Sequence, residues 1–181
     1  MNTMLLHSCC APCSAAVLEW LAQSGYEPVL FYYNPNIYPA EEYEKRKNEL
    51  TEYAGRKDIK VIDGDYNYNE WQQTIKGFEN ESERGARCLK CFKMRLDKTA
   101  ELANTLGISL FATTLSASRW KDLNQINEAG NEAAAKYVGL TFFNKNWRKD
   151  GLQLRRNELI KENNFYNQQY CGCEYSVRNN K

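Results

Sequence analysis

Short apolar runs alternate with longer helical patterns along the chain, and this alternation constrains the fold more than any other feature. The runs cover residues 4–7, 29–33, 59–62, 110–114 and 140–143, and β-branched and aromatic side chains are frequent in them. Helical patterns are predicted at residues 12–23, 40–54, 70–76, 88–106, 120–137 and 152–163. Strands that alternate with helices build a parallel sheet with helices on both faces. We therefore expect a Rossmann-like α/β fold.

The length favours one domain. A chain of 181 residues is long enough to bury roughly two thirds of its unfolded surface without help from a metal. The sequence contains no internal repeat, linker or composition change that would mark a second domain. We expect a single α/β domain over residues 1–181, in which the segment 164–181 returns a Cys-Gly-Cys pair to the active site.

The seven cysteines fall into three close groups: Cys9-Cys10 with Cys13, Cys88-x-x-Cys91, and Cys171-Gly172-Cys173. Structural cysteines would be scattered singly, whereas thiols this close together can converge on one ion or cluster. The chain begins without a basic, signal-like segment, and its apolar runs fall far short of the roughly 20 residues of a membrane span. We therefore expect a cytoplasmic protein outside the membrane, where cysteine groups indicate metal or redox chemistry and not disulfide staples.

Two of the groups lie where a metal site is expected. Cys9 and Cys10 follow the first predicted strand, and ligands of open α/β sheets bind beyond the carboxyl ends of the strands. Cys88 and Cys91 start a helix, whose dipole stabilises thiolate. These four thiolates suit either tetrahedral zinc or a 4Fe-4S cluster. The directly adjacent Cys9-Cys10 pair is uncommon in zinc modules and favours the cluster.

The remaining cysteines and the single histidine leave alternatives open. Cys171 and Cys173, separated by one glycine, are predicted to form a strained and easily reduced disulfide, or else to bind metal. Cys13 is either a ligand of a second metal ion or a buried small side chain. His7, next to the cysteines, either donates a proton or has a structural role.

The charged residues add a hypothesis about the partner. The net charge is only +1, but basic side chains gather around the second and third cysteine groups. They either bind nucleic acid phosphates or form a solvated helix face. Neither G-x-G-x-x-G nor G-x-x-x-x-G-K-[ST] follows the first strand, which argues against nucleotide binding in the usual manner.

Four motifs in order give the chain a resemblance to the QueH family of epoxyqueuosine reductases. They are His7-Ser8-Cys9-Cys10-Ala11-Pro12; Arg87-Cys88-x-x-Cys91-x-x-x-Arg95-Leu96; Thr113-Thr114-Leu115 with Ser118 and Lys121; and Gln169-Tyr170-Cys171-Gly172-Cys173-x-Tyr175-Ser176. Asn36-Ile37-x-Pro39 and Tyr43-x-x-Arg46 lie between the first two. The resemblance covers nearly the whole chain.

The resemblance implies a fold and a function. The fold is that of the adenine nucleotide α-hydrolases (HUP-like), in agreement with the predicted strands and helices. The function is the last step of queuosine biosynthesis, in which the epoxide of epoxyqueuosine in tRNA is reduced to the cyclopentene. A tRNA substrate and an electron donor such as ferredoxin or flavodoxin are implied as partners.

The resemblance also assigns roles to residues. It implies that Cys9, Cys10, Cys88 and Cys91 bind a 4Fe-4S cluster, that Cys171 and Cys173 are the redox-active pair, and that Cys13 binds a second iron. We further interpret four residues as candidates for substrate binding or acid catalysis, namely His7, Thr114, Ser118 and Lys121. The candidates for tRNA binding are Arg87, Arg95, Arg148 and Lys149, with a base stacked on an aromatic side chain such as Tyr33, Tyr66 or Trp120.

Two other readings compete with a reductase. One is a zinc-stabilised RNA-binding module in which all cysteines are structural. The other is a tRNA sulfur-transfer enzyme with a persulfide-carrying cysteine, although such enzymes usually need an ATP-binding glycine loop, which the sequence lacks.

Overall fold

A computed structural model describes residues 2–177, and its centre is a five-stranded sheet. The strands are β1 (Asn2–His7), β2 (Tyr26–Tyr32), β3 (Val61–Asp63), β4 (Leu110–Thr113) and β5 (Thr141–Phe142). All neighbouring strands pair in parallel, in the order β3-β2-β1-β4-β5. The parallel α/β fold expected from the sequence is confirmed.

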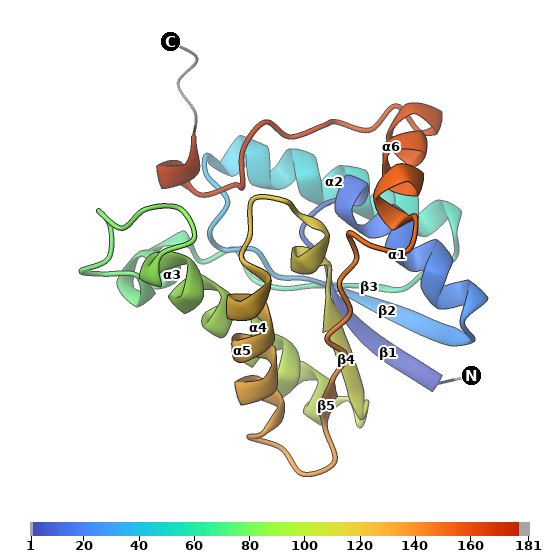
Figure 1. The fold of residues 1–181 in the computed structure, drawn as a ribbon, viewed down its shortest axis with the longest axis horizontal. Coiled ribbons are helices and arrows are strands. Elements are labelled where there is room, and N and C mark those ends of the chain that lie inside the picture. The colour runs from blue at the N-terminus through green and yellow to red at the C-terminus, as the bar shows by residue number, and fades with distance from the viewer. Residues whose placement is uncertain (1, 178–181) are drawn as a thin grey trace.

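The helices cover both faces of this sheet (Figure 1). They are α1 (Ala11–Gln23), α2 (Ala40–Arg56), α3 (Tyr68–Thr74), α4 (Ala86–Thr105), α5 (Leu123–Ala134) and α6 (Leu152–Glu162). Helix α1 packs against α2 and α6 on one face, while α4 packs against α3 and α5 on the other. There are also two short 3-10 helices. One, Thr114–Ala117, directly follows β4, and the other, Glu174–Ser176, lies near the end of the chain. In the described residues, no helix is long and apolar enough to cross a membrane.

The central strand shows why this sequence folds as a parallel sheet. Met4, Leu5 and Leu6 of β1 are fully buried on both faces, and such continuous apolar runs are typical of strands that are covered on both sides. Burial of each of these side chains contributes about 1.5–3 kcal/mol. Gly130 of α5 packs directly on the Phe142 ring, so any larger side chain there would separate the helix from β5.

Helices α2 and α6 begin at the predicted residues, and the other four starts differ from the predicted ones by one to three residues. The start of the fifth helix differs for a local reason. Residues 114–117 first form a 3-10 turn, and Asp122 then caps α5 by accepting a hydrogen bond of 3.0 Å from the backbone N–H of Gln125. The helix therefore begins at Leu123 and not at residue 120.

The sheet order places a ligand-binding position next to β1. The chain continues from β1 to β2 on one side, while β4 pairs on the other side, so connections leave in opposite directions at the carboxyl end of β1. Open parallel sheets bind ligands at such a switch point. His7 ends β1 there, and Cys9 and Cys10 follow it directly.

Candidate metal and redox site

The first cysteine group is compact and buried. The sulfur atoms of Cys9, Cys10 and Cys13 all lie within 4.8 Å of one another, and those of Cys9 and Cys10 are 3.8 Å apart. Pro12 lies in the first turn of α1, where proline favours the start of a helix, and Cys10 is the N-cap residue of this helix. Hydrogen bonds from the Cys10 and Cys13 thiols lower the pKa of Cys9, whereas burial raises the pKa of Cys10. The group can therefore supply thiolate ligands to a cation.

The second group lies in the first turns of α4 and meets the third group. Burial raises the pKa of Cys88 to about 12, and the charges of Cys91, Cys171 and Cys173 act in the same direction. Cys91 and Cys173 pack together in a small apolar cluster with Trp71 and Ile75. The structure thus brings Cys88, Cys91, Cys171 and Cys173 near one another, beside the first group.

Each of the four predicted cluster ligands has a polar neighbour at its sulfur. Cys9 Sγ lies 3.5 Å from Thr114 Oγ1, and Cys10 Sγ lies 3.5 Å from Gln168 Oε1. The backbone N–H of Arg84 donates to Cys88 Sγ at 3.3 Å, and Arg95 Nη1 lies 4.0 Å from Cys91 Sγ. At Cys10 the amide oxygen of Gln168 accepts the thiol proton, whereas the neighbours of Cys9, Cys88 and Cys91 can donate. Donors stabilise thiolates and lie around the sulfurs of iron–sulfur clusters.

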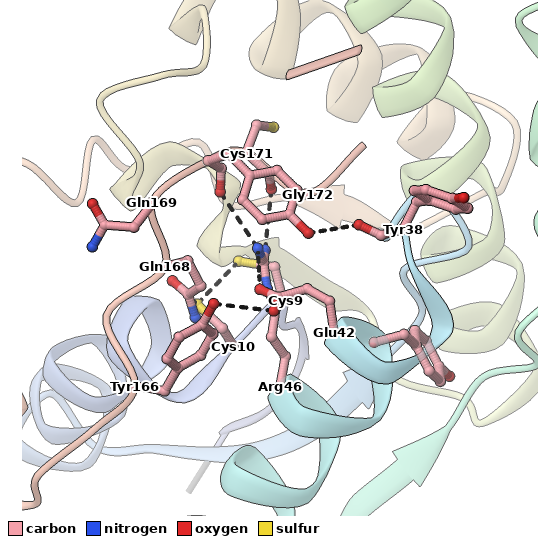
Figure 2. A network of polar contacts seen from close by, with 12 residues as sticks. Cys9, Cys10, Tyr38, Glu42, Arg46, Tyr166, Gln168, Gln169, Cys171 and Gly172 are labelled. Carbon is pink, nitrogen blue, oxygen red and sulfur yellow. Dashed lines mark hydrogen bonds and ion pairs between the residues drawn. The ribbon is translucent and has the colours of Figure 1, made fainter. Parts of the chain in front are cut away.

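The segment that carries Cys171 and Cys173 is held by a buried arginine (Figure 2). Arg46 of α2 is 2% exposed and forms an ion pair of 2.7 Å with Glu42. Its guanidinium also donates to the carbonyls of Cys171 at 3.2 Å and Tyr170 at 3.4 Å. This side chain therefore helps to join the tail to the domain.

Gly172 is the residue that permits this close approach. Its φ is +134°, a conformation that side-chain-bearing residues rarely adopt. A Cβ at this position would lie 3.2 Å from both Arg46 Nη1 and Ile37 Cγ1. Its carbonyl accepts a hydrogen bond of 2.9 Å from the backbone N–H of Tyr38. Both cysteines are free thiols.

A cavity of about 260 Å³ opens beside the first cysteine group. Two of the predicted substrate-binding residues, Ser118 and Lys121, line it, whereas Thr114 is fully buried beside Cys9. Although burial opposes its charge, the nearby sulfurs of Cys171 and Cys9 raise the pKa of Lys121. The full lining consists of Cys9, Cys10, Cys13, Arg46, Ala117, Ser118, Arg119, Trp120, Lys121, Gln153, Arg156, Asn157, Asn167, Gln168, Gln169, Tyr170 and Cys171.

His7 lies outside this cavity, and both of its ring nitrogens form hydrogen bonds within the fold. Its Nε2–H donates to the carbonyl of Tyr33 at 2.9 Å, and its Nδ1 accepts a hydrogen bond of 2.8 Å from the Thr113 hydroxyl. Complete burial, with a further contribution from Arg95, lowers the pKa of His7 to about 3. Since both nitrogens are occupied and the ring stays neutral, the structure favours the structural alternative over a proton donor.

The four basic candidates for tRNA binding differ in their surroundings. Arg87 is buried and donates to the carbonyls of Glu79 and Glu81, and Arg95 is buried and donates to Asn34 Oδ1. These two guanidinium groups bond to the protein itself and are not displayed to a surface phosphate. Arg148 is half-buried and donates to the carbonyl of Lys121 at 2.7 Å, while Lys149 is exposed. Burial and the nearby Arg84 lower the pKa of Arg148.

The three aromatic candidates for base stacking also differ in their surroundings. Tyr33 stacks on Phe31 with ring centroids 5.7 Å apart, and Tyr66 stacks on Tyr43 at 4.0 Å. Trp120 instead lines the cavity. Of the three, Trp120 is therefore the one placed to meet a ligand there.

Sequence reasoning missed two residues of the site. Arg46 entered the sequence analysis only as part of the motif Tyr43-x-x-Arg46, and Gln168, which directly precedes the fourth motif, was assigned no role. Arg46 contacts the tail across more than a hundred residues of chain, and Gln168 contacts Cys10 in the same long-range manner. The only sign that Arg46 belongs to the site is its burial in a charged amphipathic helix, and this burial depends on tertiary structure.

Together, the fold and the site define a Rossmann-like α/β protein with a cysteine-rich site at the switch point of its sheet. The family model "Epoxyqueuosine reductase QueH" matches residues 4–179. A protein of that name from Haemophilus influenzae is 49% identical over 177 residues, which are 98% of this chain and 72% of the relative. Proteins of the same name from Acinetobacter baylyi and Thermotoga maritima are 46% and 37% identical, and the matches cover 81% and 91% of their lengths. The chain belongs to the QueH family of epoxyqueuosine reductases.

A solved structure supports the fold. A predicted subunit of tRNA methyltransferase from Methanocaldococcus jannaschii superposes with a TM-score of 0.52 and 16% sequence identity. The match covers 91% of this chain and 88% of that chain. At this identity the likeness concerns the fold alone.

Proposed function

We propose that the protein reduces the epoxide of epoxyqueuosine in tRNA to the cyclopentene, the last step of queuosine biosynthesis. The reaction consumes two electrons and two protons and releases the epoxide oxygen as water. The observation that carries this proposal is a cavity lined by Cys9, Cys10, Cys13 and Cys171, in a chain of the epoxyqueuosine reductase family. Cys171 and Cys173 in turn lie near Cys88 and Cys91.

The proposed cluster ligands are Cys9, Cys10, Cys88 and Cys91. The donor set fits a 4Fe-4S cluster, because the sulfurs of Cys9, Cys88 and Cys91 each have a neighbour that can donate to a ligated thiolate. Arg95 adds a buried positive charge near the Cys91 sulfur, which offsets the negative charge of thiolate ligands. When bound, the cluster would supply single electrons. Cys13, buried next to Cys9, is the proposed ligand of a second iron.

A specific observation also favours a second assignment for the metal. The three sulfurs of the first cysteine group lie within 4.8 Å, a spacing that suits one tetrahedral ion with metal–sulfur bonds of ~2.3 Å. In this alternative, Cys13 replaces Cys88 and Cys91 as a ligand, and the ion is zinc or a single iron. Metal analysis of a Cys88→Ser variant separates the two assignments.

The Cys171/Cys173 pair is proposed to hold the electron pair. Oxidation of two thiols to one disulfide releases two electrons and two protons, the same number that the epoxide reduction consumes. Arg46 keeps this pair beside the cavity. An external donor such as ferredoxin or flavodoxin would then reduce the disulfide. In this proposal the chain is one domain, and the segment 164–181 returns the pair to the site; its last four residues lie outside the described part.

The proposed acid is Lys121. It lines the cavity, its pKa is raised, and its ammonium group can donate a proton to the leaving oxygen without help from His7. Ser118 and Thr114 remain candidates for hydrogen bonds to the substrate. Arg148 and Lys149 are the proposed phosphate contacts, with Trp120 as the aromatic platform.

The test is an anaerobic assay with tRNA that contains epoxyqueuosine, dithionite as reductant, and mass spectrometry of the nucleosides. Conversion to queuosine by the wild-type protein, together with its loss in Cys88→Ser, supports the proposal. Metal-loaded protein that leaves the epoxide intact contradicts it. Thiolation of tRNA that depends on ATP would instead support the sulfur-transfer reading.

A further inference from the structure

We propose that Gln168 is a positioning residue that donates its side-chain N–H to the Cys10 sulfur when Cys10 is a metal ligand, and thereby raises the reduction potential of the bound cluster. The inference deepens the proposed function and rests on the cluster proposed there. It assigns Gln168 a part in setting how readily the site accepts electrons.

The first observation is the position of the Gln168 side chain. Gln168 is 6% exposed, although it belongs to a tail segment whose neighbours Asn167 and Gln169 are exposed. Its amide lies against the first cysteine group, with Oε1 3.5 Å from Cys10 Sγ (Figure 2). A glutamine is rarely buried in a protein without a polar partner that needs it.

The second observation is an unsatisfied donor. The Nε2 atom of Gln168 is buried and has no hydrogen-bond partner among the described residues. A buried donor without a partner costs about 1–3 kcal/mol. One end of the amide thus meets the Cys10 sulfur, while the other end has two N–H groups and no acceptor.

Metal ligation changes the hydrogen-bond partner that the Cys10 sulfur needs, from an acceptor to a donor. In the structure the Cys10 thiol donates its proton to Oε1. A ligated sulfur has no proton, so it would face the lone pairs of Oε1 at the same distance, which is unfavourable. Rotation of the amide by 180° exchanges Oε1 with Nε2 in the same space and turns the contact into an N–H···S hydrogen bond. Since the Nε2 end has no hydrogen-bond partner that would hold the present orientation, the state of the sulfur decides the orientation.

The rotated amide also completes a pattern. Cys88 already receives an N–H from Arg84, Cys91 has the guanidinium of Arg95 nearby, and Cys9 contacts the Thr114 hydroxyl. Among the four proposed ligands, Cys10 is the one whose neighbour is an acceptor in the structure. With the rotation, all four sulfurs have a donor.

A donor at a ligand sulfur changes the potential in a known direction. Reduction adds negative charge to the cluster and its sulfurs, and a hydrogen bond to a sulfur stabilises that charge. Gln168 lies three residues before Cys171, in the segment that carries the redox pair. The chain segment that delivers the thiols therefore also delivers this donor.

The test is the midpoint potential of the cluster in Gln168→Met, which keeps the length of the side chain and removes the donor. We expect the ratio of reduced to oxidised cluster at a fixed solution potential to fall about tenfold, a shift of about 59 mV for one electron. The matched control is Gln169→Met, an exposed neighbour whose amide bonds to the carbonyl of Asn167. It should keep the wild-type potential.

A second measurement, on the wild-type protein, tests the inference even if the variant does not bind the cluster. Pulsed electron paramagnetic resonance of the reduced wild-type protein, labelled with ¹⁵N in glutamine side chains, should show a coupled nitrogen at the cluster. A variant with full iron and an unchanged potential, or a wild-type protein without this coupling, overturns the inference. Wild-type protein without iron and sulfide contradicts the proposed cluster instead, so the two failures can be distinguished.

Discussion

Replacement of Arg46 by lysine should release the tail segment that carries Cys171 and Cys173 without unfolding the domain. Lysine keeps a positive charge beside the buried Glu42 carboxylate, so the ion pair at 2.7 Å has a substitute. It lacks the planar fork of the guanidinium, which bonds Glu42 and the two tail carbonyls at the same time. The variant therefore separates the anchoring of the tail from the stability of the ion pair.

The magnitude follows from the two lost hydrogen bonds. A hydrogen bond with a charged partner contributes about 1.5–3 kcal/mol, so the two bonds to the carbonyls of Tyr170 and Cys171 contribute about 3 kcal/mol at the lower limit. Because each 1.4 kcal/mol is tenfold in an equilibrium constant, the detached tail should become roughly 100-fold more populated.

Hydrogen–deuterium exchange over residues 168–177 measures this population, and multiple-turnover reduction of the tRNA substrate measures its consequence. We expect faster exchange in this segment, slower turnover and an unchanged iron content. Arg56→Lys is the matched control, since Arg56 lies on the same helix and pairs with Glu52 at the surface. Wild-type exchange of residues 168–177 in Arg46→Lys would refute the reasoning.

Four further predictions concern the metal, the thiols, the tRNA and pH. Cys88→Ser should lose most of the bound iron, whereas Cys13→Ser should keep the cluster; metal that is kept in Cys88→Ser and lost in Cys13→Ser, measured by metal analysis, would favour the single-ion site. Cys173→Ser should keep its iron and fail in multiple-turnover reduction of the tRNA substrate, because one thiol cannot store the electron pair as an intramolecular disulfide; loss of iron would contradict the proposed role of the pair. Arg148→Ala should weaken tRNA binding and reduce its dependence on salt in a filter-binding titration, whereas an unchanged salt slope would count against a phosphate contact. Lowering the pH from 7 to 5 should cost the protein about 2 kcal/mol of unfolding free energy through His7. The pKa of His7 is about 3 in the folded protein and 6.5 in the unfolded chain, so protons bind the unfolded chain preferentially. Urea denaturation should show a smaller loss for His7→Gln.

The elements of the fold were predictable because local signals define them. The continuous apolar run of β1, Pro12 in the first turn of α1 and Gly25 after its end are visible in the sequence. The position of Cys9 and Cys10 at the switch point of the sheet was likewise predictable, since both directly follow the first strand.

The environment of individual side chains was not predictable in this way. Arg87 and Arg95 were interpreted as tRNA contacts from their charge, but the structure buries both and bonds them to the protein's own carbonyl and amide oxygens. The contacts of Arg46 and Gln168 join segments more than a hundred residues apart. Such contacts depend on how the tail folds back over the site, and no local pattern encodes that path.

The most direct test of the account is metal and sulfide analysis of protein purified without oxygen, with a visible spectrum recorded before and after addition of dithionite. The account predicts about four irons with an equal amount of sulfide, and a visible absorption band that bleaches on reduction. Stoichiometric zinc in a colourless protein would contradict it and would assign Cys9, Cys10 and Cys13 to a structural ion.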